Sequence, residues 1–294
     1  FGSTWRRRIE GVSVVDDLIY ELKGVGYTYG GGIVALRDVD MAVRVGEKVA
    51  ILGANGSGKS TLLKILDGLY FATTGSVRAF GVPLDERLLA DDAVAYAFRR
   101  RVGFVFQDSD VQLFSASVWD EVAFGPLQLG LSQAEVAQRV GDTLALLGIE
   151  GLAERPPYRL SAGEKKKVCL ASVLSLRPEV LLMDEPTAGL DPRSRCVLVD
   201  FICHLHERGH TIVTATHDLD ILDDIAERVL VFDEAKRLVA AGTPSQVLAD
   251  EDLLLRTNLV HAHVHRHDAL VHAHRHQHFR AHDHDHSEPG QATN

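Results

Sequence analysis

The sequence predicts an α/β fold built around a largely parallel sheet. Between about residues 18 and 248, short apolar runs alternate with stretches of helical periodicity. Each run ends at a turn or a polar residue, as expected for a parallel strand that helices cover on both faces. With 294 residues, 46% of them hydrophobic, the chain can bury a large core.

Four runs are the clearest strands, namely KVAILG, RVGFVF, VLLMDE and TIVTAT. From about residue 83 to 177 the sequence is otherwise dominated by helical patterns. In SQAEVAQRVGDTLALLG, Ser132 fits a helix N-cap and Gly148 fits a C-terminal stop. We therefore expect a helical subdomain at about residues 83–177, inserted in a main domain of residues 14–250.

Both ends of the chain lie outside this pattern. Residues 1–13 form an N-terminal extension with no secretory signal, and we assign them no role. Residues 251–294 form a histidine-rich tail in which no core-forming period survives. We expect this tail to be a separate, mobile segment.

Composition excludes several classes of protein. A formal net charge of -10 opposes a nucleic-acid partner held by phosphate attraction. The three cysteines have neither metal-type spacing nor a disulfide framework, which indicates a reducing compartment. No uninterrupted apolar run approaches the roughly 18 residues that a membrane span needs. We expect no nucleic-acid partner and no span.

A phosphate-binding loop follows the first of the four strands. GANGSGKST fits the pattern G-x-x-x-x-G-K-[ST] and lies between a strand and a helix, where backbone N–H groups and the helix N-terminus can hold a polyphosphate. Lys59 would bind the β and γ phosphates, and Ser60 would bind Mg²⁺. The candidate loop residues are Gly53, Ala54, Asn55, Gly56, Ser57, Gly58, Lys59, Ser60 and Thr61.

Two carboxylates end the strand VLLMDE. Adjacent side chains at the end of a strand can take different roles, because the chain is leaving the sheet there. Asp184 would hold Mg²⁺, directly or through water. Glu185 would act as general base toward the attacking water.

Further motifs, in a fixed order, narrow the class of phosphate-binding protein. LSAGEKKKV at residues 160–168 resembles the signature sequence of ATP-binding-cassette (ABC) proteins. Gln107 resembles the family's Q-loop glutamine, residues 188–191 resemble its D-loop, and His217 resembles its switch histidine. Tyr29 resembles the aromatic residue that stacks on adenine, with Tyr27 as the second choice. The resemblance covers roughly residues 18–250.

The resemblance implies a P-loop ABC cassette with an additional antiparallel β subdomain. It also implies a head-to-tail dimer, of two identical chains or of close paralogues, with two ATP molecules at the interface. Ser161 and the backbone N–H of Gly163 would contact the γ-phosphate from across that interface, and Asp191 of the D-loop is a further candidate ATP-binding residue. Gln107 would reach Mg²⁺, and His217 would hold the water and Glu185 in line.

The signature departs from the common LSGGQ at two positions. Ala162 replaces the first glycine, so the loop there must tolerate an ordinary backbone angle. Glu164 replaces the glutamine and places a carboxylate near the polyphosphate. Because Ser161 and Gly163 are present, we expect an active ATPase.

The segment after Gln107, DSDVQLFSASVWDEVAFGPLQLGLS, resembles ATPase subunits of energy-coupling-factor and cobalt/nickel uptake systems. In these systems the segment forms a groove that receives a coupling helix of an integral membrane subunit. The resemblance implies a peripheral protein on the cytoplasmic face of the membrane. The same stretch also predicts packing within the helical subdomain by Phe114, Val118, Val122 and Phe124.

The tail adds a candidate transition-metal site. Imidazole binds Ni²⁺, Cu²⁺, Zn²⁺ and Co²⁺ when it is neutral, and alternating H-x-H can place several nitrogens around one ion. Such a run selects no single metal by itself, and the alternative is a low-complexity extension that binds metals incidentally. The candidate ligands are His261, His263, His265, His267, His272, His274, His276, His278, His282, His284 and His286.

Together these features predict an ATPase subunit of a nickel or cobalt importer. Two alternatives within the family are an importer ATPase for another substrate, such as a vitamin, and a soluble mechanochemical ABC ATPase. The soluble alternative predicts a long coiled-coil insertion or tandem cassettes, whereas this chain has one cassette with a modest insertion. A third alternative, a metal-buffering protein, leaves the complete ATPase motif set unexplained.

Overall fold

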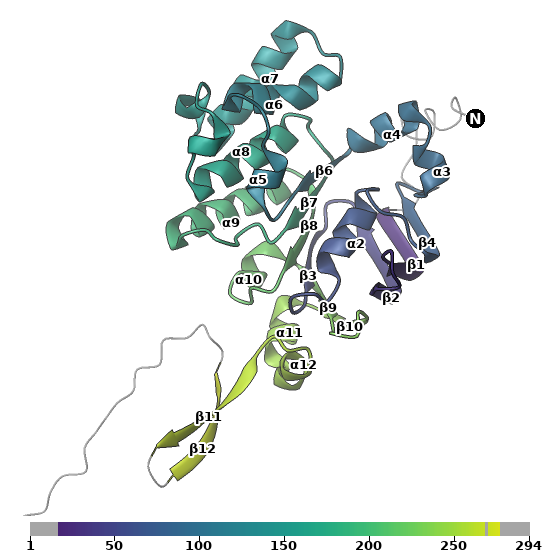
Figure 1. Cartoon of the computed structure of the whole chain (residues 1–294), viewed down its shortest axis with the longest axis vertical. Helices are drawn as coiled ribbons and strands as arrows, with labels where there is room; N and C mark the ends of the chain where they lie inside the picture. The colour runs from purple at the N-terminus through teal and green to yellow at the C-terminus, as the bar shows by residue number, and fades with distance from the viewer. Residues whose placement is uncertain (1–16, 268–269, 277–294) are drawn as a thin grey trace, which may run out of the picture.

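The computed structural model describes residues 17–267 and 270–276 (Figure 1). Its central sheet contains, in spatial order, β10 (Leu238–Gly242), β9 (Arg228–Phe232), β3 (Lys48–Leu52), β8 (Thr211–Thr216), β7 (Val180–Asp184) and β6 (Val102–Val105). From β9 to β6 all neighbours pair parallel, while β10 pairs antiparallel with β9. The predicted α/β class is confirmed, and β3, β6, β7 and β8 are the four predicted strands.

The apolar runs of these strands fill two core regions on opposite faces of the sheet. In β7, Val180 and Leu182 join a core that includes helix α2 (Lys59–Leu66). Leu181 and Met183, which alternate with them, join a second core that includes helices α8 (Ala162–Leu174) and α9 (Pro192–Glu207). Burial on both faces explains why the strand sequences are continuously apolar.

An antiparallel sheet packs beside α2. It contains β2 (Val34–Arg44), β1 (Leu18–Thr28), β4 (Thr74–Ala79) and β5 (Val82–Pro83) in that spatial order. Residues of β1, β2, α2 and β3 belong to one core cluster, so the two sheets and the helix between them fold as one unit. This is the antiparallel subdomain that the family resemblance implies.

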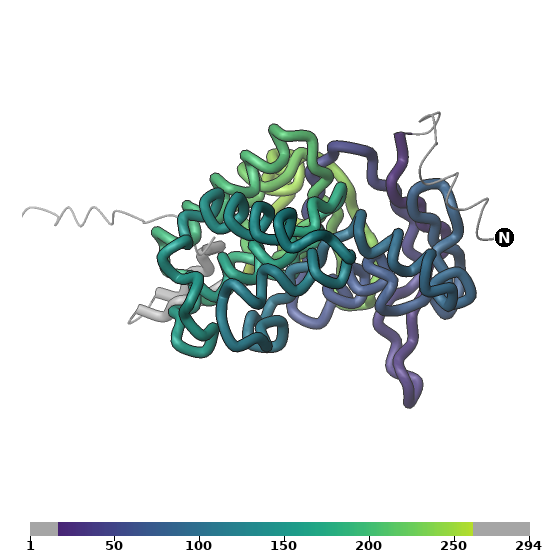
Figure 2. The backbone as a smooth tube through the Cα atoms, turned by 90° about the horizontal axis from the view of Figure 1, so that it is seen from above, coloured from purple at the N-terminus to yellow at the C-terminus, as the bar shows by residue number. Residues whose placement is uncertain are grey.

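The helical segment after β6 lies on the opposite side of the molecule from the antiparallel sheet. Figure 2 shows these helices in teal and strands β1 and β2 in purple. The helices after β6 are α5 (Ser109–Gln112), α6 (Val118–Gln128), α7 (Gln133–Leu147) and α8, with short 3-10 turns at η1 (Glu150–Leu152) and η2 (Pro157–Arg159). Ser132 caps α7 in a reciprocal capping box with Glu135, and Gly148 ends it with φ 63°, as the sequence predicts.

Within the range 83–177, not every element belongs to this helical cluster. The short helices α3 (Glu86–Leu89) and α4 (Asp92–Arg99) precede β6, and β6 itself lies at an edge of the central sheet. After the sheet, α10 (Leu222–Ile225), α11 (Pro244–Ala249) and α12 (Glu251–Arg256) complete the body. No helix in residues 17–267 and 270–276 is both long and apolar enough to cross a bilayer.

The beginning of the tail contains two strands that the sequence analysis does not predict. β11 (His261–His267) pairs antiparallel with β12 (Leu270–His276), and the register places His261 opposite His276, His263 opposite His274, and His265 opposite His272. Alternation of histidine with other residues has a period of two, which is the period of a strand. His278, His282, His284, His286 and the extension at residues 1–13 lie outside the described residues.

Candidate functional site

The phosphate-binding loop lies between β3 and α2, as its motif requires. Gly56 and Gly58 have φ values of +79° and +104°, in the left-handed region that favours glycine. A Cβ atom on Gly58 would lie 2.4 Å from the carbonyl oxygen of Ala35. The tight loop therefore requires glycine at this position, both for its backbone angle and for its close approach to β2.

Lys59 connects this loop to the end of β7. Its side chain is 5% exposed, and its Nζ atom donates to the carbonyl oxygen of Gly53 at 2.8 Å. The same Nζ lies 3.4 Å from Oε1 of Glu185. An ammonium group held between the loop and a carboxylate can be redirected to a phosphate at little cost, because it is already desolvated.

Asp184 and Glu185 share a strand end but have different surroundings. Glu185 has φ 44°, a strained value for a non-glycine residue. Burial raises the pKa of the Asp184 carboxyl, and a hydrogen bond from Ser60 acts in the opposite direction. The Oδ1 atom of Asp184 is buried and has no hydrogen-bond partner among the described residues.

Those features fit a divalent cation. A buried carboxylate oxygen without a donor is costly unless a cation or water satisfies it. The hydroxyl of Ser60, next to Asp184, adds a second hard oxygen ligand of the kind that Mg²⁺ prefers. The residues present therefore fit Mg²⁺ at the junction of α2 and β7.

Glu185 is held by two residues at the end of β8. Its Oε1 atom lies 2.9 Å from Nδ1 of His217, and its Oε2 atom accepts a hydrogen bond from Oγ1 of Thr216 at 3.3 Å. Glu185 is 4% exposed, whereas the side chain of His217 is 51% exposed. This arrangement leaves a buried base next to a histidine that solvent or a ligand can reach.

Thr216 is a site residue that sequence analysis missed. It ends the strand TIVTAT directly before the candidate switch histidine, and no motif distinguishes its hydroxyl in the sequence. Its hydroxyl also accepts a hydrogen bond from the backbone N–H of Asp218 at 3.0 Å. Thr216 thus fixes the turn that carries His217.

Tyr29 lies against the helix that begins at the phosphate loop. Its hydroxyl is 2.8 Å from Oγ1 of Thr61, and its ring meets the rings of Tyr27 and Tyr70 edge-on, with centroids 5.0 and 5.8 Å away. Tyr27 instead stacks on Tyr70 at 5.2 Å and packs against the core. Of the two tyrosines, Tyr29 is the one linked by a hydrogen bond to the phosphate-loop helix.

The signature segment forms the N-terminus of α8. Ser161 is the N-cap, and its Oγ atom accepts the backbone N–H of Glu164 at 3.3 Å, while Glu164 Oε2 accepts the backbone N–H of Ser161 at 2.8 Å. These hydrogen bonds lower the pKa of the Glu164 carboxyl. Ala162 is the first helical residue and has no left-handed angle. Both departures from LSGGQ therefore fit an ordinary capped helix.

The signature lies against the start of α9. A Cβ atom on Gly163 would lie 2.9 Å from Oγ of Ser194, so glycine permits this close approach. Asp191 caps α9: its carboxylate accepts hydrogen bonds from the hydroxyl of Ser194 at 2.6 Å and from the backbone N–H of Ser194 at 3.0 Å, and these bonds, the hydroxyl's first, lower the pKa of the Asp191 carboxyl. A polar hollow of about 440 Å³ is lined by Ser161, Gly163 and Ser194, among others.

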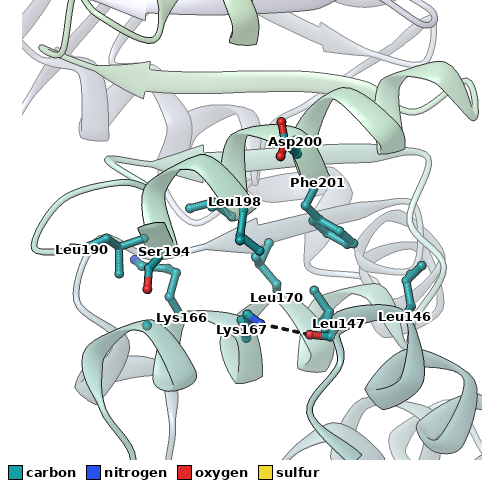
Figure 3. A pocket seen from close by; sticks show the side chains of 12 residues that line it. Leu146, Leu147, Lys166, Lys167, Leu170, Leu190, Ser194, Leu198, Asp200 and Phe201 are labelled. Carbon is teal, nitrogen blue, oxygen red and sulfur yellow. Dashed lines mark hydrogen bonds between the residues drawn. The ribbon is translucent and has the colours of Figure 1, made fainter. Parts of the chain in front are cut away.

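A second, apolar pocket of about 260 Å³ lies between α8 and α9 (Figure 3). Its lining includes Leu147, Leu170, Leu198 and Phe201. It touches the signature through Gly163 but contains neither the phosphate loop nor the carboxylates of β7. The chemistry of the site therefore lies outside this pocket.

The structure thus gathers the candidate residues into two sets. Hydrogen bonds and ion pairs join Lys59, Glu185 and His217 in one set, at the carboxyl ends of β3, β7 and β8. Ser161 and Asp191 belong to the other, at the starts of α8 and α9. Gln107 is exposed two residues after β6, between the central sheet and the helical segment.

One packing prediction for the segment after Gln107 is wrong. Val118 and Val122 are fully buried, but Phe114 and Phe124 are 66% and 44% exposed. The two rings meet edge-to-face with centroids 5.0 Å apart. Buried Glu121 holds the loop that carries Phe114, since its Oε2 atom accepts the backbone N–H groups of Phe114 and Ser115 at 2.9 and 2.7 Å. Phe124 lies in helix α6.

Comparisons with known proteins identify the same class as these motifs. A family profile described as ABC transporter matches residues 36–188. A provisionally named ABC transporter ATP-binding protein of Caldanaerobacter subterraneus is 50% identical over 244 residues, covering 83% of this chain and all of that protein. The nickel import ATP-binding protein NikO of Rhodobacter capsulatus is 50% identical over 244 residues, covering 82% and 95%.

Comparison with solved structures also identifies ABC proteins. The chain resembles cbiO1 of Clostridium perfringens, described as part of the ABC transporter complex cbiONQ, with a TM-score of 0.72, 38% identity, and coverage of 83% and 96%. It also resembles a dimeric ATP-binding cassette, MJ0796, bound to ADP and Pi in a post-hydrolysis state, with a TM-score of 0.69, 29% identity, and coverage of 76% and 98%.

Proposed function

The chain belongs to the ABC transporter family, as an ATPase that couples ATP hydrolysis to transport, and from this premise we propose that it energises an importer of Ni²⁺ or Co²⁺. The observation that carries the proposal is its 50% identity to a nickel import ATPase over nearly that protein's whole length. The exposed aromatic pair after Gln107 and the histidine-rich tail add independent support.

ATP would bind at the phosphate loop of this chain. Backbone N–H groups of the loop and the N-terminus of α2 would hold the β and γ phosphates, and Tyr29 would stack on adenine. Lys59 would turn from the carbonyl of Gly53 to the phosphates. That movement would also release the ammonium from Glu185, which leaves the carboxylate free to accept a proton.

Ser60, Asp184 and Gln107 would hold Mg²⁺. When bound, the ion offsets negative charge on the β and γ phosphates. The protein's own contribution is the buried, unpaired oxygen of Asp184, which gains a partner in the nucleotide-bound state. ATP binding therefore relieves a cost that the free protein carries.

Hydrolysis would use Glu185 as general base. Its carboxylate would accept a proton from water as the water oxygen attacks the γ-phosphorus and the bond to the β-phosphate oxygen breaks. Thr216 and His217 fix the two carboxylate oxygens, so the base is oriented before the substrate arrives. His217, half exposed, would also donate a hydrogen bond to the γ-phosphate.

The second set of residues would act on the partner's nucleotide. Ser161 and Gly163 lie at a helix N-terminus, which favours an anion, and Asp191 lies beside them. In a head-to-tail dimer, of identical chains or close paralogues, each ATP would lie between one phosphate loop and the other subunit's signature. ATP would close the dimer, and hydrolysis would open it.

The membrane partner would dock on the exposed aromatic pair. Exposed aromatic side chains held in a fixed position are typical of the anchors of protein interfaces. Phe114 and Phe124 fit that description, with Val111 and Leu127 exposed near them in sequence. The chain would then be a peripheral protein on the cytoplasmic face of the membrane.

The tail would bind the transported metal. Its eleven candidate histidines suit Ni²⁺ and Co²⁺ chemically, and the antiparallel register of β11 and β12 places three pairs of them at facing positions. The catalytic residues need no such metal. The tail would therefore buffer cargo on the cytoplasmic side.

Uptake in cells that carry the native gene tests this function. Cells with Glu185→Gln should lose uptake of radiolabelled Ni²⁺ or Co²⁺, while cells with the wild-type chain accumulate it. Loss of vitamin uptake with normal metal uptake would instead support the vitamin alternative. If the chain never co-purifies with an integral membrane protein, both importer proposals fail and the soluble alternative gains support.

A further inference from the structure

Lys166 is a buried lysine that the proposed chemistry does not use. It is 4% exposed, lies on the inner face of α8, and donates from Nζ to two backbone carbonyls, those of Phe106 at 3.1 Å and Gln107 at 2.9 Å. Burial lowers the pKa of its ammonium group, and Cys169 and Asp184 act in the opposite direction. The lysine thus ties the signature helix to the backbone of the Q-loop.

Two neighbouring contacts repeat this link. Lys165 forms an ion pair of 2.6 Å with Asp110 of α5. The amide of Gln112 accepts the backbone N–H of Phe106 at 3.0 Å and donates to the carbonyl of Cys169 in α8 at 3.1 Å. One side of α8 therefore holds the segment 106–112 at several points, with Lys166 as the buried one.

The ammonium group of Lys166 is not required for packing alone. Burying a charged lysine costs free energy that its hydrogen bonds must offset, and methionine would fill similar space without that cost. The ammonium group adds a directional hydrogen bond to the backbone carbonyl of Gln107. A rigid connection is useful where two segments must move together.

The two segments that Lys166 joins would act on different ATP molecules of the dimer. In the proposed dimer, Ser161 and Gly163 at the start of α8 contact the ATP of the partner, while Gln107 reaches the ATP of its own chain. We propose that Lys166 is a positioning residue that couples the two ATP sites, by moving the Q-loop of one site together with the signature of the other. This inference rests on the proposed dimeric function.

Adjacent lysines allow a matched test. Lys167 follows Lys166 in the same helix and also donates from Nζ to a backbone carbonyl, that of Leu147 at 3.2 Å, as Figure 3 shows. Its acceptor lies at the end of α7 and not in the Q-loop. Lys167→Met therefore removes the same kind of bond from the same helix and leaves the proposed connection intact.

The measurement is the ATP dependence of hydrolysis by the full-length protein with Mg²⁺. The wild type and Lys167→Met should have a Hill coefficient well above 1, since two coupled sites allow a value up to about 2. Lys166→Met should have a Hill coefficient near 1 and a kcat lowered about tenfold, with half-saturation within about twofold of wild type. Lys166→Arg, which keeps charge and donors, should recover part of the cooperativity.

Gln112→Leu is a second test of the connection in case Lys166→Met does not fold. Gln112 is half-buried, and its substitution removes another hydrogen bond between the segment 106–112 and α8. It should lower the Hill coefficient in the same direction by a smaller amount. If Lys166→Met folds and its cooperativity is unchanged, the proposal is overturned, while the proposed ATPase function stands. If Lys166→Met does not fold, unchanged cooperativity in Gln112→Leu overturns the proposal in the same way. A wild-type protein without hydrolysis or cooperativity would overturn the dimeric function itself.

Discussion

Glu185 combines a strained backbone with a carboxylate that three residues surround. Lys59, Thr216 and His217 all lie within 3.4 Å of its oxygens. Such precise support matters for a general base, because a base must be aimed at the water before the reaction begins. The positive φ of Glu185 is consistent with strain held at a functional position.

We expect Glu185→Gln to bind ATP with near wild-type affinity and to hydrolyse it at least about 100-fold more slowly. The amide keeps the size of the side chain but cannot accept a proton from water, and general-base catalysis typically contributes about 10²- to 10⁴-fold. Steady-state hydrolysis and equilibrium ATP binding measure the two effects separately. In the presence of ATP and Mg²⁺, light scattering should detect an accumulated dimer.

Glu179→Gln is the matched control. Glu179 precedes β7, is 53% exposed in its side chain, and pairs with Arg101 at the surface. The two hydrogen bonds from Arg101 to Glu179 lie outside the catalytic set of Lys59, Glu185 and His217, so this variant should retain wild-type turnover. Equal turnover in Glu185→Gln and Glu179→Gln would remove Glu185 from the mechanism.

Asp67 gives a prediction about pH. Burial raises the pKa of its carboxyl to about 7, while Arg99 acts to lower it. In the unfolded chain the same carboxyl titrates near its ordinary value of about 3.9, so between about pH 4 and 7 the folded state binds more protons. The free energy of unfolding should therefore fall as pH rises through this window and level off above it.

Asp67→Asn should remove that dependence. The amide is a neutral match for the protonated carboxyl, so the variant should be more stable than wild type at pH 8, by about 1–2 kcal/mol after allowance for partial exposure, and equal to it near pH 4. Urea unfolding at the two pH values measures the difference. A constant difference across the window would show that Asp67 does not titrate there.

At the residue scale, sequence analysis succeeds where chemistry is contiguous. Lys59 and the Asp184–Glu185 pair were predictable because each lies in a short motif between a recognisable strand and the element that follows. Thr216 and Lys166 were not, because their partners lie 31 and 59–60 residues away in sequence. A single residue carries no signal for a contact of that range, and only the assembled sheet and α8 supply it.

At the element scale, the segment 109–128 turns sequence into a surface. Val118 and Val122 are buried, whereas Val111, Phe114 and Phe124 are exposed. The carboxylate of Glu121 fixes the loop before α6 through two backbone N–H groups. Periodicity could predict the helix but not this loop, in which a buried acid replaces regular hydrogen bonding. The same limit explains the wrong packing prediction for Phe114, which lies in this loop.

We expect Phe114→Ala to separate ATP hydrolysis from partner binding. Removal of an exposed ring should change stability by less than about 1 kcal/mol and leave hydrolysis by the isolated protein unchanged. Loss of an interface anchor can cost about 2 kcal/mol or more of binding. Co-purification with the membrane partner and metal uptake should therefore fall together.

Tyr158→Ala is the control for this variant. Tyr158 is a larger aromatic residue, 74% exposed, in η2 and not in the segment 109–128. Its removal should leave co-purification and uptake intact. If Phe114→Ala retains as much membrane partner as Tyr158→Ala does, the aromatic pair is not the docking surface.

Local patterns predicted elements better than their assembly. The four central strands and the capped helix α7 have clear sequence signals, because period and capping act within a few residues. β9 and β10 carry the same kind of apolar or small-residue runs but were not singled out, and the strand order β10-β9-β3-β8-β7-β6 depends on crossovers that no local pattern contains. The strands of the tail were missed because alternation there involves histidine rather than apolar residues.

At the scale of the whole molecule, the catalytic body and the tail have separable chemistry. In the proposed function, nucleotide chemistry involves Lys59, Asp184, Glu185 and His217, all in the body of the protein, which α12 completes before the histidine-rich strands β11 and β12. In the proposed function, the tail contributes imidazoles, which bind Ni²⁺ or Co²⁺ when neutral and release it when protonated. ATP hydrolysis should therefore be independent of the tail, while metal retention should depend on it and on pH.

Substitution of the eleven candidate histidines by glutamine keeps the length and polarity of the tail and removes its metal ligands. We expect this variant to hydrolyse ATP at the wild-type rate, to lose most bound Ni²⁺ in equilibrium dialysis at pH 7.5, and to accumulate less metal in cells when external Ni²⁺ is scarce. The wild type should release its Ni²⁺ between about pH 7 and 5.5, because protonated imidazole cannot bind metal. Substitution of the tail arginines Arg266 and Arg275 by glutamine, as a control, should change none of these results. Normal Ni²⁺ retention in the histidine-free variant would place the cargo-binding residues elsewhere in the chain.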